Sequence, residues 1–184
     1  MDLKNDLEIV NEFQKEIIIL NRIVALMQWD NQTYMPKMAA EERAEQISYI
    51  SQLIHEKTID NKFWNSVKKL HENRDLDERQ KRMIDILYKE ISKSKKLPKD
   101  FVAEISKEKA LSFNAWQKAR LDNNAEIFLP HLKKIVELKR KEVEYRGYEE
   151  HPYNTLLDDY EEGMKVSKLD PIFEKLKNGL FELI

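Results

Sequence analysis

Apolar residues recur every three or four positions along most of this sequence, and little interrupts that spacing. Only 3 of the 184 residues are glycine and 5 are proline, whereas Glu, Lys, Leu and Ile are abundant. Such spacing places the apolar side chains on one face of an α-helix, and this composition favours helix throughout. The sequence therefore predicts an all-α protein, built as a multi-helix array.

Polar or proline-containing breaks separate the expected helices. We expect helices over about 3–29, 38–55, 60–70, 78–91, 98–121, 125–147 and 167–184. The first carries a main apolar stripe and extra isoleucines at Ile18, Ile19 and Ile23, so we expect it to be buried on more than one side. We place its end in the polar run from Trp29 to Thr33, because Pro36 follows closely.

Capping residues predict where several helices begin. Asp60 is expected to cap the third helix, and the run Asp75–Glu78 has the form of a capping box for the fourth. Pro98 suits the first turn of the fifth helix, where its missing N–H costs nothing. Pro130 is expected to mark a kink in the sixth helix, and the Ser167 hydroxyl to cap the last.

The last predicted helix stays apolar up to Ile184, with no polar tail or glycine to end it. We expect from this that the chain is a truncated piece of a longer protein. The alternative is that Phe181 and Ile184 complete the packing of the core.

Composition excludes several classes of function. The net charge is only −2 and the two signs are interspersed, so no basic surface for nucleic acid is expected. There is no cysteine, which removes disulfides, thiolate chemistry and cysteine ligation of metals. The longest apolar runs, such as Ile17–Leu20, are far too short to span a membrane, and the first residues do not read as a signal peptide. We therefore expect a soluble cytoplasmic protein.

Neither a metal site nor a catalytic group is expected within these residues. Two of the four histidines begin a His-Glu pair, but a helical zinc motif needs a second histidine four residues on. Ile59 and Asp75 occupy those positions. The histidines are His55, His71, His131 and His151, and we expect each to be an ordinary surface or helix-end residue. Three scattered glycines also cannot form a nucleophile elbow or a phosphate-binding loop.

Two polar segments are unusual enough to be candidate sites. Trp29 and Asp30 stand where a buried helix meets a polar loop, so the indole could pack inward while the carboxylate caps or binds. Asp158 and Asp159 are adjacent acids, which on a helix would point about 100° apart and would converge only in a loop. For both segments a purely structural role is the competing interpretation.

Taken together, these segments resemble a known family. The run Trp29-Asp-Asn-Gln-Thr-Tyr-Met-Pro36, followed by Ala39-Ala-Glu-Glu-Arg-Ala-Glu-Gln46, is similar to the N-terminal region of the carboxypeptidase Taq family. The run His151-Pro-Tyr-Asn-Thr-Leu-Leu-Asp-Asp-Tyr-Glu-Glu-Gly-Met164 resembles a later segment of the same family, with Leu129–Leu132 and Val136–Lys139 in order between them. Asn154 and Glu162 depart from the common pattern, where Asp and Pro are frequent.

The resemblance implies the N-terminal part of a larger helical peptidase of roughly 500 residues. Members of the family are zinc-dependent, often tolerant of cobalt, commonly homodimeric, and release single residues from peptide C-termini. Their metal ligands lie on a His-Glu-x-x-His helix and a later Glu, and no residue here matches those elements. The resemblance thus implies no catalytic or metal-binding residue and no bound cofactor in this chain. The peptide substrate and the C-terminal part of the enzyme would be its partners.

What the chain would supply is a wall or lid of the substrate groove. Six residues are candidates for lining that groove or for shaping its junction, namely Trp29, Asp30, Tyr153, Asp158, Asp159 and Tyr160. Residues 1–184 would form either a single helical domain or the first segment of the peptidase. The alternative function is a stand-alone helical module that binds peptides or a partner helix without cleaving them, with the apolar end at Leu180–Ile184 as its docking face. A coiled-coil scaffold is disfavoured, because no heptad pattern persists.

Overall fold

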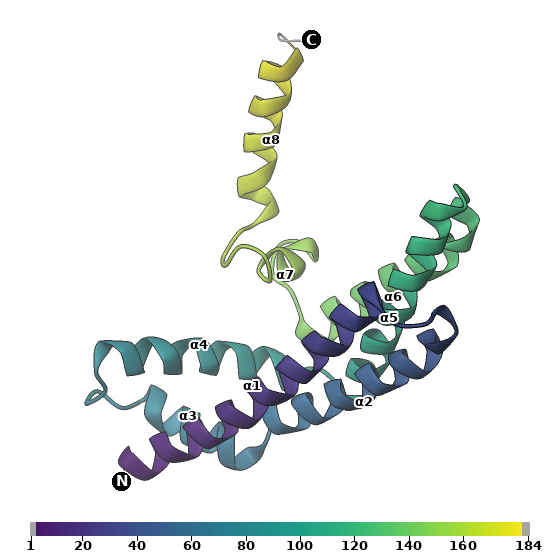
Figure 1. The fold of residues 1–184 in the computed structure, drawn as a ribbon. Coiled ribbons are helices and arrows are strands. Elements are labelled where there is room, and N and C mark those ends of the chain that lie inside the picture. The colour runs from purple at the N-terminus through teal and green to yellow at the C-terminus, as the bar shows by residue number, and fades with distance from the viewer. Residues whose placement is uncertain (1–2, 182–184) are drawn as a thin grey trace. The chain divides into compact units, whose positions relative to one another are not determined.

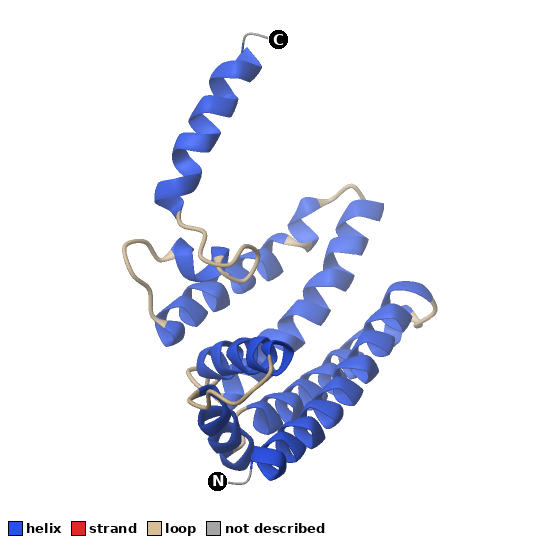
Figure 2. Cartoon of the chain, turned by 90° about the vertical axis from the view of Figure 1, so that its left-hand side faces the viewer, coloured by secondary structure: helices blue, strands red, loops and turns tan. Residues whose placement is uncertain are grey.

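The structure is a computed structural model that describes residues 3–181, and 82% of these residues are helical. Within this range there is no strand, as Figure 2 shows, so the all-α prediction is confirmed. The chain divides into two compact units, Met1–Val136 (unit 1) and Glu137–Ile184 (unit 2). Each unit is described by itself below.

The helices follow one another with short connections. In chain order they are α1 (Leu3–Thr33), η1 (Lys37–Ala39), α2 (Ala40–Thr58), α3 (Asn61–His71), α4 (Glu78–Ser94), α5 (Lys99–Leu121), η2 (Ala125–Ile127), α6 (Leu129–Arg146), α7 (Tyr153–Leu157) and α8 (Val166–Phe181). The boundary between the units falls inside α6.

Helix α1 contributes side chains to both hydrophobic clusters of unit 1 and packs against α2 and α3. Its first half buries Val10 in a cluster with residues of α3 and α4, and its second half brings Val24 and Met27 against α2 and α5. The first cluster consists of Val10, Phe63, Val67, Leu70, Ile84 and Ile91; the second consists of Ala44, Ile47 and Ala110. Figure 1 shows α1 lying alongside α2.

Two expectations about α1 are wrong. The helix does not end at Trp29 but continues to Thr33, whose hydroxyl donates to the Trp29 carbonyl at 2.8 Å. Polar side chains that project from the helix surface can be solvated or paired without any break in the backbone. The side chains of Ile18, Ile19 and Ile23 are also not buried; all three are exposed. Within unit 1, only one side of α1 is covered.

Capping was predicted correctly in type but not always in position. Asp60 caps α3 as expected, with its carboxylate accepting from the backbone of Lys62 and Phe63. The capping box of α4 is formed by Asp77 and Gln80, rather than starting at Asp75. The box two residues later satisfies the backbone N–H groups of Asp77 and Gln80.

The sixth and last helices also differ from expectation. The predicted kink at Pro130 is instead a break, in which η2 ends at Ile127 and α6 starts at Leu129. Proline fits the first turn of a new helix, because its N–H is not needed there. Helix α8 starts at Val166, and the Val166 N–H donates to Asn154 Oδ1 at 2.9 Å. This capping bond is thus made to the Asn154 side chain and not to the Ser167 hydroxyl.

His55 is not an ordinary surface histidine. Its side chain lies at the end of α2 and is only 5% exposed. The ring Nε2 lies 3.0 Å from the Leu97 carbonyl in the α4–α5 connection, and a neutral ring donates its proton there. Burial lowers the pKa of His55, more than the bond to Leu97 and the charge of Glu56 raise it.

This depressed pKa predicts a pH dependence of stability. The unfolded chain takes up a proton on this residue near pH 6.5, whereas the folded protein resists protonation until lower pH. The contribution of His55 to the free energy of unfolding is therefore complete above pH 6.5 and is lost as the pH falls through the folded pKa. Urea unfolding of wild type and His55→Gln between pH 5 and 8 should show a shallower pH slope for the variant. Equal slopes would contradict the assignment.

Candidate functional site

The first motif segment forms a tie between α1 and α2. Arg43 Nη2 of α2 lies 2.7 Å from Asp30 Oδ2 at the end of α1. The same guanidinium donates from Nη1 to the Met27 carbonyl at 2.8 Å and from Nε to Gln46 Oε1 at 3.1 Å. Arg43 thus uses the fork geometry of its side chain to hold the last turns of α1. Asp30 is therefore engaged in an ion pair within the protein, and a role for it in lining a groove stays a prediction.

Trp29 does not pack inward. Its indole is exposed, with Tyr34 as an edge-to-face neighbour at 5.4 Å between ring centroids. Asp30 and Trp29 therefore differ in what they offer: the carboxylate is engaged by Arg43, while the ring presents an apolar surface to solvent.

The second motif segment is organised by Arg146 at the end of α6. Its guanidinium holds Asp159 through two bonds, Nη1 to Oδ2 at 2.6 Å and Nη2 to Oδ1 at 2.8 Å. Nη1 also donates to Glu142 Oε1 at 3.1 Å, one turn earlier on α6. Arg146 and Glu142 are both buried. The bond to Asp159 and the charges of both carboxylates raise the pKa of Arg146 against the opposing effect of burial, so the cation is permanent.

Hydrogen bonds between side chains and backbone groups fold the rest of this segment into a compact loop around α7. The Asp158 carboxylate accepts from the Gly163 N–H at 2.8 Å, and the Thr155 hydroxyl donates to the Gly147 carbonyl at 2.8 Å. Asn154 bridges the loop, donating to the Glu149 carbonyl and accepting from Val166. Gly147 and Gly163 take φ values of 74° and 75°, which glycine adopts without the strain that a side chain would cause.

The two adjacent acids therefore do not converge on one site. Asp158 is bonded to the backbone of Gly163 and Asp159 to Arg146, in different directions along the loop. Of the candidates in unit 2, Tyr153, Asp159 and Tyr160 are exposed, and Tyr160 is 91% exposed.

The six candidate residues fall into two sets. Trp29 and Asp30 belong to unit 1, whereas Tyr153, Asp158, Asp159 and Tyr160 belong to unit 2. Each set is brought together within its own unit, and groove lining stays a prediction for both. Sequence reasoning missed the partners Arg43, Glu142 and Arg146. The four-residue spacing of Glu142 and Arg146 on one helix was the available signal for that pair.

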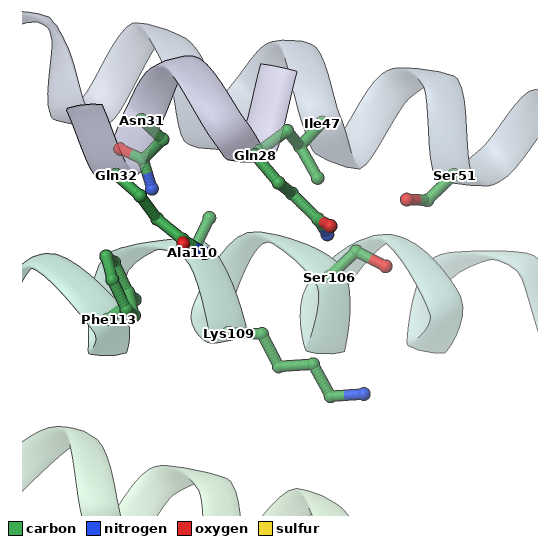
Figure 3. A pocket seen from close by; sticks show the side chains of 9 residues that line it. All are labelled: Gln28, Asn31, Gln32, Ile47, Ser51, Ser106, Lys109, Ala110 and Phe113. Atoms are coloured by element: carbon green, nitrogen blue, oxygen red, sulfur yellow. The ribbon is translucent and has the colours of Figure 1, made fainter. Parts of the chain in front are cut away.

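A pocket of about 370 Å³ lies between α1, α2 and α5 in unit 1. Figure 3 shows its lining, which includes the amides of Gln28, Asn31 and Gln32, the hydroxyls of Ser51 and Ser106, and Lys109. No carboxylate or imidazole is among the lining residues, so the pocket has the groups to hydrogen-bond a polar ligand but not to ligate a metal.

Across residues 3–181, no three His, Asp or Glu side chains lie close enough together to hold a metal ion. No helix in that range is both long enough and apolar enough to cross a membrane.

The Asp30–Arg43 pair should contribute measurably to stability. In a double-mutant cycle with Asp30→Ala and Arg43→Ala, we expect a coupling energy of about 1–2 kcal/mol, because both side chains are largely shielded and share a network. Urea unfolding monitored by circular dichroism gives the four free energies. The exposed Lys118–Asp122 pair on α5 is the matched control, with an expected coupling of about 0.3–0.5 kcal/mol. Equal coupling for the two pairs would refute the role given to Arg43.

The Arg146–Asp159 fork should hold the loop 147–166 in place. Asp159→Asn removes the charge that faces the buried Arg146 guanidinium, from a carboxylate whose own side chain is 34% exposed. We expect the free energy of local opening to fall by about 1–3 kcal/mol, because a buried cation loses its partner. Hydrogen exchange of the loop amides should accelerate by roughly 10- to 100-fold. Asp170→Asn, an exposed acid in the same unit, is the control and should leave the rates unchanged. Unaltered exchange in Asp159→Asn would show that the loop is held by its backbone bonds alone.

Both motif segments lie in a region that is similar to known proteins. A sequence profile described as carboxypeptidase Taq (M32) metallopeptidase matches residues 9–184. Carboxypeptidase 1 of Bacillus subtilis (strain 168) is 33% identical over 187 residues, and thermostable carboxypeptidase 1 of Pyrococcus furiosus is 32% identical over 181 residues. Each alignment covers 95% of this chain but 36% of the relative.

Solved structures agree with the sequence matches. The crystal structure of BsuCP superposes with a TM-score of 0.89 at 32% identity, covering 94% of this chain and 35% of that one. The M32 carboxypeptidase from Deinococcus radiodurans R1 gives 0.78 at 27% identity, covering 98% and 36%. The chain thus spans little more than a third of the relatives it matches, as their N-terminal helical part. By its profile match, its sequence identity and its fold, it belongs to the carboxypeptidase Taq (M32) metallopeptidase family.

Proposed function

We propose that this chain is the first segment, residues 1–184, of a metal-dependent carboxypeptidase that releases C-terminal amino acids from peptides. The observation that carries the proposal is the match of residues 9–184 to the M32 family, over 95% of the chain but 36% of its relatives. The proposal includes zinc or cobalt as the metal, the cytoplasm as the compartment and a homodimer as the assembly, as the family resemblance implies.

The metal belongs to the remainder of the enzyme in this proposal. A bound metal in such enzymes polarises the scissile carbonyl and lowers the pKa of its water to near 7, which takes about three protein ligands in fixed geometry. The residues described here do not fit that role, since 3–181 contain no group of three suitable side chains. No step of hydrolysis is therefore assigned to a residue of this chain.

The chain's own contribution is to shape the substrate groove. The Arg43 tie fixes the end of α1, and the Arg146 fork fixes the loop after α6, so the outward aromatic side chains stand on well-determined backbone. We assign groove lining to Tyr153 and Tyr160, because exposed rings offer large apolar area to a peptide at low entropic cost. Trp29, at the end of α1, is assigned to the junction with the rest of the enzyme. Asp30, Asp158 and Asp159 shape the junctions instead, since each carboxylate is already bonded within its unit.

A second candidate function is a module that binds a peptide or helix without cleaving it. It is favoured by a mainly apolar groove of about 360 Å³ along α8, lined by Phe173, Leu176, Lys177, Leu180 and Phe181. No residue of α8 is buried, so the expectation that Phe181 completes a core is wrong; Ile184 lies outside the described residues. A binding module would use this groove without any metal-dependent turnover.

The isolated 184-residue chain should be inactive. We expect no release of the C-terminal residue from a blocked dipeptide in the presence of zinc or cobalt, because the ligands are supplied by another part of the enzyme. The chain joined to the remaining part of the Bacillus subtilis relative should cleave the same substrate, with the full-length relative as positive control. Metal-dependent turnover by the purified chain alone would contradict the proposal, and binding of the dipeptide by an inactive fusion would favour the module.

A further inference from the structure

Helix α1 has a second apolar stripe on its outer side. Ile18, Ile19, Ile23, Leu26 and Trp29 repeat at three- and four-residue spacing and so share one face. Their exposed fractions are 45%, 47%, 42%, 64% and 53%. We call these five residues the outer stripe. It extends over about 17 Å of helix, which is the length over which one helix crosses another.

The outer stripe is distinct from the face that builds unit 1. Val10, Ile17 and Val24 point into the two clusters, and at 100° per residue they lie on the opposite side of the helix from Ile19 and Leu26. A surface helix that packs on one side only carries a polar outer face. Five large apolar side chains along three turns instead indicate a helix that is packed on both sides in its working state.

A charge on the outer stripe helps to identify what covers it. Arg22 projects from the middle of the stripe, between Ile18, Ile19 and Leu26, and is exposed. Within residues 3–181 the guanidinium of Arg22 forms neither an ion pair nor a hydrogen bond. A complementary surface would therefore be apolar with a carboxylate opposite Arg22, because a buried cation needs a partner.

A second copy of this chain does not fit that description. A two-fold pairing of α1 centred on the stripe would bring Arg22 of each copy towards the other, and like charges disfavour such an interface. The match to this chain covers only 36% of the Bacillus subtilis relative, so almost two-thirds of that protein lies outside it. That length of polypeptide is ample for a helix that covers the stripe.

We propose that the outer stripe of α1 is the docking surface for the remaining part of the carboxypeptidase, through a helix with an apolar face and an acidic residue opposite Arg22. The proposal rests on the function proposed above. It makes α1 the central helix between two layers, one supplied by α2–α5 and the other by the rest of the enzyme.

The absence of cysteine allows the surface to be tested directly by thiol labelling. Leu26→Cys places a single thiol in this chain on the outer stripe, Met38→Cys places one at a site that is 96% exposed and off the stripe, and Val10→Cys places one in the core. Each is labelled with a maleimide in the 184-residue chain and in its fusion to the remainder of the Bacillus subtilis carboxypeptidase, with the modified residue identified by peptide mass.

We expect the Leu26→Cys thiol to react readily in the isolated chain and roughly 100-fold more slowly in the fusion, because labelling would then require opening of the contact. The Met38→Cys thiol should react readily in both proteins, and the Val10→Cys thiol slowly in both. Adding Arg22→Glu to the Leu26→Cys fusion should raise labelling about tenfold, through like-charge repulsion at the contact.

Three results would overturn the proposal. One is fast labelling of Leu26→Cys in a fusion whose Val10→Cys thiol is protected. Another is protection of Leu26→Cys in the isolated chain that increases with protein concentration, which would identify a second copy as the occupant. The third result applies if the fusion fails to protect Val10→Cys. A cysteine is then placed in the full-length Bacillus subtilis enzyme at the position aligned with Leu26, and fast labelling of that cysteine would overturn the proposal. Peptidase activity of the fusion, measured separately, reports on the proposed function and not on this surface.

Discussion

The inward face of α1 is the constraint on which unit 1 depends. A single helix of 31 residues, about 46 Å long, contributes Val10 to one cluster and Val24 and Met27 to another. Neither cluster is large, so each relies on the helix to join it to the other. The small side chains of Ala44 and Ala110 let α2 and α5 approach closely in the second cluster, where larger residues would hold them apart.

The segments that mark the family turn out to be structural ties around charged side chains. Arg43 binds a carboxylate and a backbone carbonyl of α1, and Arg146 binds two carboxylates, one of them across 13 residues of loop. Arginine suits both positions because its planar fork can satisfy several acceptors at once. The groups these ties hold in place, Trp29 and the tyrosines of unit 2, are the ones still exposed for contact with another molecule.

Much of the fold could be predicted because its determinants are local. Periodicity gave the helices, and Asp60 gave the start of α3, since a cap involves only neighbours in sequence. The errors lie where a distant partner decides the outcome. Whether Ile19 is buried depends on what packs against α1, and the burial of His55 depends on the α4–α5 connection, neither of which spacing reveals.

The same reasoning explains the candidate site. Asp30 and Asp159 were identified as unusual from their neighbours, but their roles follow from Arg43 and Arg146, which lie 13 residues away in each case. A buried bond between the Ser66 hydroxyl and Asp6, 60 residues apart, was not predicted for the same reason. A carboxylate in a sequence motif looks like a ligand until its partner is known.

The short connections between consecutive helices have a consequence for synthesis. The most extensive helix contact of unit 1 joins α2 with α5, which are separated along the chain by α3 and α4, so it can form only after α5 has been synthesised. In the synthesis of a longer carboxypeptidase, all of α1–α5 would leave the ribosome before the polypeptide that follows them. These helices could therefore pack together while the rest of the enzyme is still being made. During that interval the isoleucines on the far side of α1 face solvent, as bare apolar surface of the kind that chaperones recognise on partly folded chains.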